Sequence, residues 1–263
     1  DALTVTGLNR SQWVGFAGAP NTQTITLHTP FKKKNIGLGM SFINDKIGTG
    51  GGIRNTSFFV DFAYTIQTGL KSKLAFGLKG GANMFQANLA SLTVNDADPS
   101  FVNIRNKPLP NVGFGLYYYR QRFYAGISVP KLIQTNVKNL AAVTNITQRH
   151  YFFIMGTVLK VAEQLDFKPT CLVKVTTGAP VEVDLTGNLI IHKNLSLGAA
   201  YRTGDAVSAL IGYQISEQFY VGYSDDWSFG LKTGKSNAGS HEVMLRYDFF
   251  FSNEQKIRSP RYF

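Results

Sequence analysis

Apolar and polar side chains alternate residue by residue through most of this 263-residue sequence. The pattern is clearest over residues 58–67, 73–84, 181–192 and 242–251. Successive side chains of a β-strand point to opposite faces, so this alternation predicts strands with one apolar and one polar face. No window of comparable length shows the 3.6-residue period of an amphipathic helix. The chain is therefore predicted to be all-β.

The strands have the length and composition of membrane-spanning strands. Several approach the roughly 9–11 residues that cross a bilayer at a tilt, and no apolar run reaches the roughly 20 residues of a spanning helix. Charged residues make up 16% of the chain, against about 25% in an ordinary soluble domain. We predict fourteen strands, at about 2–13, 22–31, 36–46, 54–67, 72–88, 110–120, 122–133, 149–162, 165–176, 181–192, 195–203, 206–215, 218–226 and 239–251.

The connections between these strands sort by length. The longest ones, at 14–21, 89–109, 134–148 and 227–238, all follow odd-numbered strands, whereas every even-numbered connection is a short turn. A soluble sandwich has no reason to sort its loops in this way, but an outer-membrane barrel places long loops outside and tight turns in the periplasm. We therefore predict a closed transmembrane β-barrel of about 14 antiparallel strands in the bacterial outer membrane, with both termini periplasmic.

A single barrel domain is expected to take up residues 1–251, and residues 252–263 are expected to form a periplasmic tail. The sequence shows no charged segment followed by an apolar core of the kind found in signal peptides. For an exported protein we therefore expect that the signal peptide has been removed.

Ionic side chains inside the strands should face the lumen, because a lysine or arginine facing lipid at mid-depth costs about 2–4 kcal/mol. Alternation assigns them to the face opposite the aliphatic residues. We expect the acids to pair with the bases, Lys73 among them, across the lumen, since buried charge needs partners. The predicted lumenal charges are Asp61, Lys79, Lys174, Glu182, Asp184, Arg202, Glu242, Arg246 and Asp248.

No residue pattern indicates catalysis. The four histidines show no metal-binding spacing, and Cys171 shares the apolar face of its strand. The run Gly48–Gly52 joins two strands, whereas a phosphate-cradling loop needs a helix start. We expect no enzyme activity, no metal and no cofactor. The net charge of +11 is spread over strands and turns without a nucleic-acid-binding signature, so we expect no nucleic-acid partner.

Basic residues gather at the predicted periplasmic end. They are either solvated turn residues or a positive rim that docks an acidic partner. Aromatic residues at 117–119, 123 and 124 flank one of these turns, where an interfacial aromatic girdle belongs. The predicted periplasmic basic rim consists of Lys32, Lys33, Lys34, Arg120, Arg122, Arg258 and Arg261, with Lys71, Lys193 and Lys256 on the same side.

Several motifs resemble the PorP/SprF family, and the resemblance extends over essentially the whole chain. The most specific is Arg10-Ser11-Gln12-Trp13-Val14-Gly15-Phe16, which is long and unusual in composition. An Asn-Pro-Ala-like stretch that usually precedes it in the family is absent. The other matching segments are 18–20 (GAP), 22–24 (TQT), 28–30 (HTP), 37–39 (GLG), 44–48 (NDKIG), 123–130 (FYAGISVP) and 259–263 (SPRYF).

The resemblance implies an outer-membrane protein of the type IX secretion and gliding machinery of Bacteroidota. Members of this kind assist the export or surface attachment of large adhesins. The implied partners are the C-terminal domain of a secreted adhesin and the periplasmic and outer-membrane components of the secretion system, in addition to outer-membrane lipid and lipopolysaccharide. The family supplies no catalytic residues to carry over.

The first outer hairpin is the leading candidate for partner binding, because exposed aromatic residues serve as anchors at interfaces. A fold-specific turn with an interfacial aromatic explains the same residues equally well. The predicted partner-binding residues are Trp13, Phe16, Pro20, Lys46 and Arg54. The main alternative function is an outer-membrane transporter or channel for hydrophobic or small solutes, which predicts an open path through the lumen. A simple porin and an outer-membrane hydrolase are more distant alternatives. The sequence leaves open whether the lumen is open or filled.

Overall fold

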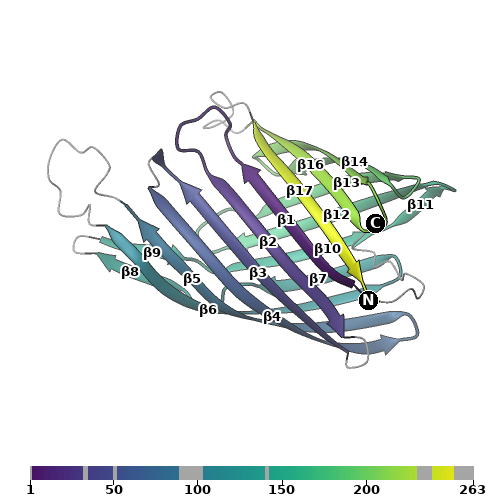
Figure 1. The fold of residues 1–263 in the computed structure, drawn as a ribbon, viewed down its shortest axis with the longest axis horizontal. Helices are drawn as coiled ribbons and strands as arrows, with labels where there is room; N and C mark the ends of the chain where they lie inside the picture. The colour runs from purple at the N-terminus through teal and green to yellow at the C-terminus, as the bar shows by residue number, and fades with distance from the viewer. Residues whose placement is uncertain are drawn as a thin grey trace.

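Fourteen antiparallel strands close into a barrel in the computed structural model (Figure 1). The structure describes residues 2–31, 35–49, 52–88, 103–139, 142–229 and 239–251, and the side chains of these except at 105, 106, 136–139 and 142–147. The ring consists of β1 (Ala2–Ser11), β2 (Asn21–Phe31), β3 (Ile36–Ile47), β4 (Ile53–Gly69), β5 (Ser72–Ala87), β6 (Ile104–Arg120), β7 (Phe123–Val129), β10 (His150–Thr157), β12 (Leu165–Thr176), β13 (Glu182–Ile191), β14 (Leu195–Arg202), β15 (Ala206–Gln214), β16 (Phe219–Ser228) and β17 (Ser240–Phe250).

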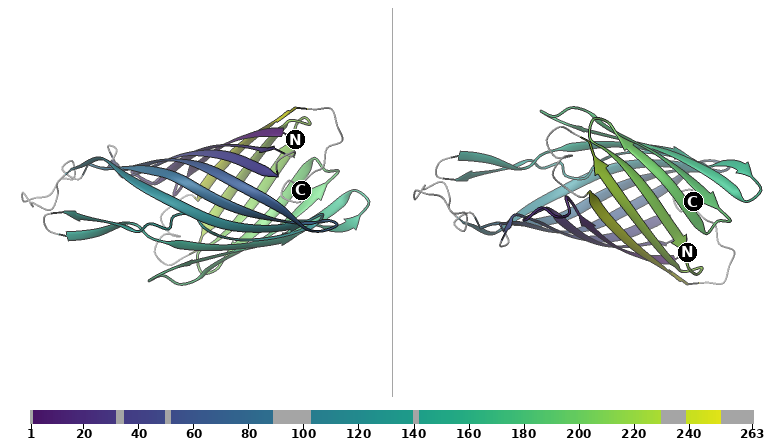
Figure 2. Two further views of the ribbon diagram at one scale, coloured as in Figure 1. Left: turned by 90° about the horizontal axis from the view of Figure 1, so that it is seen from below. Right: turned by 90° about the horizontal axis from the view of Figure 1, so that it is seen from above.

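Each strand of the ring pairs with the next one along the chain, and the pairing of β1 with β17 closes the ring. The strand β10 pairs with both β7 and β12, and β1 pairs with both β2 and β17. The short strand β11 (Leu159–Ala162) continues β10 along β12. The hairpin of β8 (Thr135–Asn139) and β9 (Ala142–Thr147) forms its own small sheet, which projects beyond one end of the barrel (Figures 1 and 2). The predicted fold class is confirmed.

Most predicted strand boundaries agree with the structure within a few residues, and β6 is the main exception. It begins at Ile104 instead of residue 110, and it contains Pro108 and Pro110. The strand β7 ends at Val129, opposite Phe114, so this outer part of β6 pairs only with β5. Proline lacks an N–H and is tolerated where one edge of a strand is unpaired. The β8–β9 hairpin also lies in the segment 134–148, which was predicted to be irregular.

The long connections all lie at one end of the barrel, which we call the long-loop end. They join β1 to β2, β5 to β6, β7 to β10 and β16 to β17. The connections at the opposite, short-turn end are tight, such as those between β4 and β5, β6 and β7, and β13 and β14. The strand β1 starts and β17 finishes at the short-turn end (Figure 1). The assignment of the short-turn end to the periplasm stays a prediction. The domain boundary at residue 251 also stays a prediction, because residues 252–263 lie outside the described residues.

Large apolar side chains cover the outer wall at alternate positions. On β4, Phe58, Val60, Phe62, Tyr64 and Ile66 are all exposed, and rows of exposed apolar residues also lie on β3, β10, β15 and β17. In a soluble protein such a surface would be a binding or aggregation site, but lipid covers it in a barrel. The ionic residues in the middle of these strands, such as Asp61 and Lys79, have the opposite parity and line the inner wall, whereas Arg54 and Arg120 near the strand ends share the outward parity. No helix with the length and apolarity of a membrane span is present in the described ranges.

A charge on the outer wall is expected to destabilise the barrel. Leu78 on β5 is 58% exposed at an outward position. Replacing Leu78 with lysine should reduce the free energy of unfolding by about 2–4 kcal/mol if this position lies near mid-bilayer. Urea titration of the barrel folded into lipid vesicles measures the change. The matched variant Leu78→Val keeps the surface apolar and should stay within about 1 kcal/mol of the parent. Equal stability of the two variants would contradict a lipid-facing wall at this position.

Candidate functional site

The loop at residues 12–20, between β1 and β2, contains most of the motif that begins at Arg10. Its ends are joined by a hydrogen bond of 2.9 Å from the Gln12 amide to the Pro20 carbonyl oxygen. Inside it, the Phe16 amide donates to the Trp13 oxygen at 3.0 Å, and the Ala19 amide donates to the Phe16 oxygen at 3.2 Å. These successive turns require left-handed backbone, with φ of 46° at Trp13, 91° at Gly15 and 78° at Gly18. The loop is therefore a compact, internally bonded element.

Neighbouring hairpins hold this loop from both sides. On one side, the Val14 amide donates to the Gly239 oxygen at 2.9 Å and the Trp13 amide donates to Ser240 Oγ at 3.2 Å. On the other side, the Gly48 amide donates to the Gly18 oxygen at 2.8 Å. A Cβ at Gly18 would lie 2.7 Å from the backbone nitrogen of Thr49, so only glycine permits this approach. The loop is thus fixed to the β16–β17 and β3–β4 connections.

All five predicted partner-binding residues lie at the long-loop end, on adjacent hairpins. Phe16 is 59% exposed, whereas Trp13 and Pro20 are half-buried. Lys46 and Arg54 are direct cross-strand partners on β3 and β4, close to the Gly18–Gly48 contact. We call Trp13, Phe16, Pro20, Lys46 and Arg54 together the outer motif surface. It combines an exposed aromatic ring on a fixed loop with two cations on the neighbouring strands β3 and β4.

The first residue of the motif, Arg10, points into the lumen and forms ion pairs there. Its Nη2 lies 2.6 Å from Asp226 Oδ2 and its Nη1 lies 3.3 Å from Glu242 Oε2. Asp226 is only 6% exposed. The pairs join β1 to β16 and β17 across the seam where the chain closes on itself. Sequence reasoning missed both Arg10 and Asp226, although Arg10 has the same parity as the polar residues Thr4 and Thr6 in its strand.

The predicted lumenal charges form pairs, but these pairs lie between neighbouring strands. Lys79 Nζ lies 3.6 Å from Asp61 Oδ1, and Lys174 Nζ lies 3.6 Å from Glu182 Oε1. Arg202 Nε lies 2.8 Å from Asp184 Oδ1 and 3.8 Å from Glu182 Oε1.

The expectation of pairing across the lumen is wrong for these residues. The register places Lys79 opposite Asp61, Lys174 opposite Glu182 and Arg202 opposite Asp184 on adjacent strands, where Cβ atoms are only about 5 Å apart. Arg246 Nε lies 3.4 Å from Asp248 Oδ2, two residues along the same strand. Lys73 has no ion pair within the part of the chain that the structure describes.

A tightly packed patch covers the inner wall of β3 to β6. Ser41, Phe59, Gly81 and Asn111 lie side by side across the four strands, and Ser57, Asn83 and Leu109 form the next row. All of these except the glycine are buried by the exposure of their side chains. Inner-wall residues of an open, water-filled channel would be exposed. The lumen is therefore filled along this part of the wall.

The segment 130–134, which follows β7, folds against this patch. Asn111, 2% exposed, holds it by donating from Nδ2 to the Ile133 oxygen at 2.7 Å and accepting from the Ile133 amide at 3.0 Å. Arg149 donates to the Leu132 oxygen at 2.8 Å and 3.1 Å. A Cβ at Gly113 would lie 2.5 Å from the Pro130 oxygen, so the segment lies directly on the strand. We call residues 130–134 the inward segment.

The inward segment brings a further cation to the inner wall. Burial lowers the pKa of the Lys131 ammonium, the charge of Asp45 opposes this shift, and Lys79 adds to it. The direction of the net effect follows from desolvation, which disfavours the charged form. The family-like motif that ends at Pro130 leads directly into this segment. The predicted strand at 122–133 is wrong beyond Val129, because the chain leaves the barrel wall there and packs on Asn111 and Gly113.

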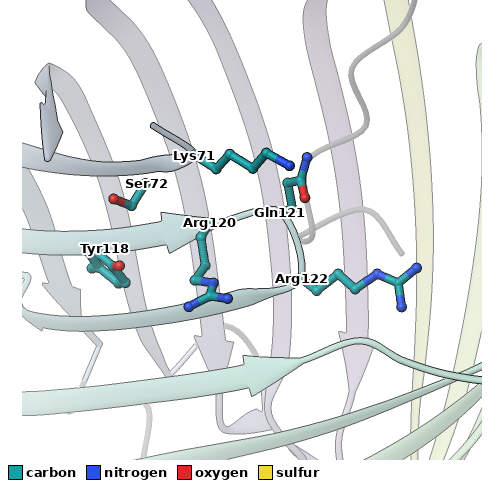
Figure 3. A pocket seen from close by; sticks show the side chains of 6 residues that line it. All are labelled: Lys71, Ser72, Tyr118, Arg120, Gln121 and Arg122. Atoms are coloured by element: carbon teal, nitrogen blue, oxygen red, sulfur yellow. The ribbon is translucent and has the colours of Figure 1, made fainter. Parts of the chain in front are cut away.

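The short-turn end holds a small cationic pocket. Two residues of the predicted basic rim, Arg120 and Arg122, line it together with Lys71, Ser72, Tyr118 and Gln121 (Figure 3). Lys32, Lys33, Lys34, Arg258 and Arg261 lie outside the described residues, so the rest of the predicted rim stays a prediction. In the described part of the chain no three His, Cys, Asp or Glu side chains are placed to hold a metal ion.

The comparison with protein families finds a match over residues 1–247 to the family described as "Type IX secretion system membrane protein PorP/SprF". A search of the curated proteins finds no match.

Among solved structures, the CymD monoaromatic hydrocarbon channel is 11% identical, with a TM-score of 0.57 over 97% of this chain and 89% of that chain. Acinetobacter baumannii Omp33 is 9% identical, with a TM-score of 0.51 over 95% of this chain and 99% of that chain. The Ralstonia pickettii toluene transporter TbuX is also 9% identical at 0.51, over 95% and 88%. These likenesses show the outer-membrane barrel fold.

Proposed function

Because this chain belongs to the PorP/SprF family of type IX secretion system membrane proteins, we propose that it is a non-catalytic outer-membrane barrel that holds a secreted adhesin at the cell surface. In this proposal the outer motif surface binds the C-terminal domain of the adhesin. The short-turn end, placed in the periplasm, docks components of the secretion machinery. The outer membrane is the location that both the family and the fold give.

The outer motif surface supports this proposal because its exposed residues are not the ones that stabilise the barrel. Arg10, the first residue of the motif, lies on a wall strand and points into the lumen, where it forms ion pairs with Asp226 and Glu242. The rest of the motif forms a rigid loop whose most exposed large side chain is Phe16. A fixed loop loses little conformational entropy on binding, which favours affinity. A benzene ring that stays in water in the free protein is well suited to be an interface anchor.

Alanine at Phe16 is expected to release the adhesin while leaving the barrel folded. An anchor residue contributes about 2 kcal/mol or more, which corresponds to a loss of affinity of about 30-fold. The measurement is the amount of adhesin that co-purifies with the tagged barrel from the native bacterium, followed by titration with its isolated C-terminal domain. Leu70→Ala is the matched control, because Leu70 is 98% exposed at the short-turn end.

Two outcomes would count against this assignment. If Phe16→Ala and Leu70→Ala retain adhesin equally, the outer motif surface does not carry the binding. If the unaltered barrel co-purifies with no adhesin at all, the escort function itself fails.

Transport of hydrophobic or small solutes remains the alternative function. It requires a continuous path through the barrel, and the packed patch on β3–β6 and the ion pairs along the inner wall oppose an apolar path. Single-channel recording in planar bilayers distinguishes the two: a transporter or porin conducts in its unaltered form, and the proposed escort barrel has a low, unselective conductance.

A further inference from the structure

The cationic pocket at the short-turn end is built by two neighbouring hairpin turns. It has a volume of about 300 Å³, and its lining comes from the β4–β5 and β6–β7 turns and the strand ends beside them. The register places Ser72 opposite Arg120, and Leu74 opposite Tyr118, on β5 and β6. The pocket therefore exists only because two hairpins that are distant in sequence lie side by side (Figure 3).

The pocket opens on the lipid side of the barrel wall. On β6, Tyr118 and Arg120 have the same parity as Val112 and Phe114, which are exposed on the outer wall. On β5, Ser72 has the same parity as the exposed residues Phe76 and Leu78. A column of apolar side chains thus runs down the outer wall and ends at the pocket. This is the level at which a strand passes from hydrocarbon to headgroups.

Aromatic rings mark the same level. The ring centroid of Tyr118 lies 6.4 Å from that of Phe123, which faces outward on β7. Tyrosine is enriched where a membrane protein meets the headgroup region, because its ring prefers the hydrocarbon and its hydroxyl prefers water. The pocket therefore lies at the edge of the bilayer.

The charges of the pocket are uncompensated. None of Lys71, Arg120 and Arg122 forms an ion pair within the described ranges, whereas the lumenal cations Lys79, Lys174 and Arg202 all do. Three like charges around one small pocket repel each other, and a bound anion would relieve this repulsion. The Lys71 and Arg122 side chains extend the same way, whereas Arg120 points elsewhere (Figure 3). All three side chains are long and flexible, so they can turn towards a shared anion.

We propose that this pocket binds the phosphate group of a phospholipid in the leaflet that surrounds the short-turn end. The guanidinium groups of Arg120 and Arg122 fit phosphate oxygens through paired N–H donors, and Lys71 adds a point charge. The Ser72 hydroxyl and the Gln121 amide can donate to the glycerol or headgroup oxygens. The acyl chains follow the apolar column past Tyr118. A lipid fits better than an acidic protein segment, because the pocket faces sideways into the membrane.

The test uses the full-length barrel in detergent, titrated with phosphatidylglycerol and measured by native mass spectrometry. The pocket variant is Arg120→Gln/Arg122→Gln. The control variant is Lys160→Gln/Lys193→Gln, which removes the same charge from exposed sites at the same end of the barrel. We expect the pocket variant to lose affinity for the first bound lipid by 10-fold or more, and the control by less than 2-fold. The shift in gel mobility between heated and unheated samples verifies that each variant is folded.

Equal losses in the pocket and control variants would overturn the proposal, because they would indicate general electrostatic attraction. Absence of any retained lipid on the unaltered barrel would also overturn it. A poly-glutamate peptide is added as a second probe. If its binding depends on Arg120 and Arg122 while lipid binding does not, the pocket is a protein-docking site and the lipid assignment is wrong. The proposal does not depend on adhesin binding, so either can fail alone.

Discussion

Alanine at Arg10 is expected to destabilise the barrel more than any other single change considered for this protein, by about 3–5 kcal/mol. Arg10 is the partner of Asp226, whose carboxylate lies 2.6 Å away and is almost fully buried. Removal of one member of a buried ion pair leaves the other charge without compensation, and this is the costly case. Because the pair lies at the β1–β17 closure, the loss should also weaken the pairing of the first and last strands.

Urea titration in lipid vesicles measures this loss, and Arg54→Ala is the matched control. Arg54 is exposed and has no ion pair in the described part of the chain, so its removal should change stability by less than about 0.5 kcal/mol. The double variant Arg10→Ala/Asp226→Asn should recover part of the loss, since it removes the uncompensated charge. A loss of under 1 kcal/mol for Arg10→Ala would contradict a structural function for this residue of the motif.

Replacement of Asn111 by alanine is expected to release the inward segment. The side chain makes three part-buried hydrogen bonds to backbone groups, at 2.7, 3.0 and 3.0 Å, and their loss leaves two donors and an acceptor without these partners. Each such group costs about 1–3 kcal/mol, so local opening of the segment should become at least 30-fold more frequent. The packed patch under the segment would then gain access to water.

Hydrogen exchange at the Ile133 amide reports this opening, and conductance in planar bilayers reports its effect on the lumen. Both are expected to rise for Asn111→Ala and to rise less for Asn111→Asp, which keeps the acceptor. Asn44→Ala is the control, because the Asn44 amide makes an exposed bond of 3.4 Å to Gln23. Unchanged exchange at Ile133 would mean that Arg149 and the backbone contacts hold the segment without Asn111.

The alternation of apolar and polar residues in the sequence was sufficient to predict the strands of the barrel wall. Strand number, approximate boundaries and the inner-wall position of the predicted lumenal charges could be predicted because each spanning segment faces the bilayer independently. A lipid-facing charge is costly wherever the strand lies in the ring, so the sequence of each strand must obey the rule locally. Lys79 and Asp184 could therefore be assigned to the inner wall without any knowledge of their neighbours. The sorting of the connections by length can likewise be recognised from the sequence alone.

The candidate sites were only partly predictable. The motif loop was expected at the long-loop end, and its five residues are there, but its attachment through Gly18, Gly48 and Gly239 depends on three hairpins at once. The start of β6 was placed too late, since Pro108 and Pro110 break a strand pattern unless one edge is free. The predicted strand at 122–133 wrongly included most of the inward segment, because the conformation of this segment is set by contacts with Asn111 and Gly113 on another strand.

The sequence by itself thus determined which side of the wall the residues of a spanning strand occupy, because each side chain prefers either lipid or the lumen regardless of its neighbours. Only the tertiary structure decided which residues meet. The pairing of Arg10 with Asp226, the filling of the lumen by residues 130–134 and the pocket between two turns all depend on strand register and ring closure. These contacts join residues far apart in the chain, and their energies arise only once the barrel has closed.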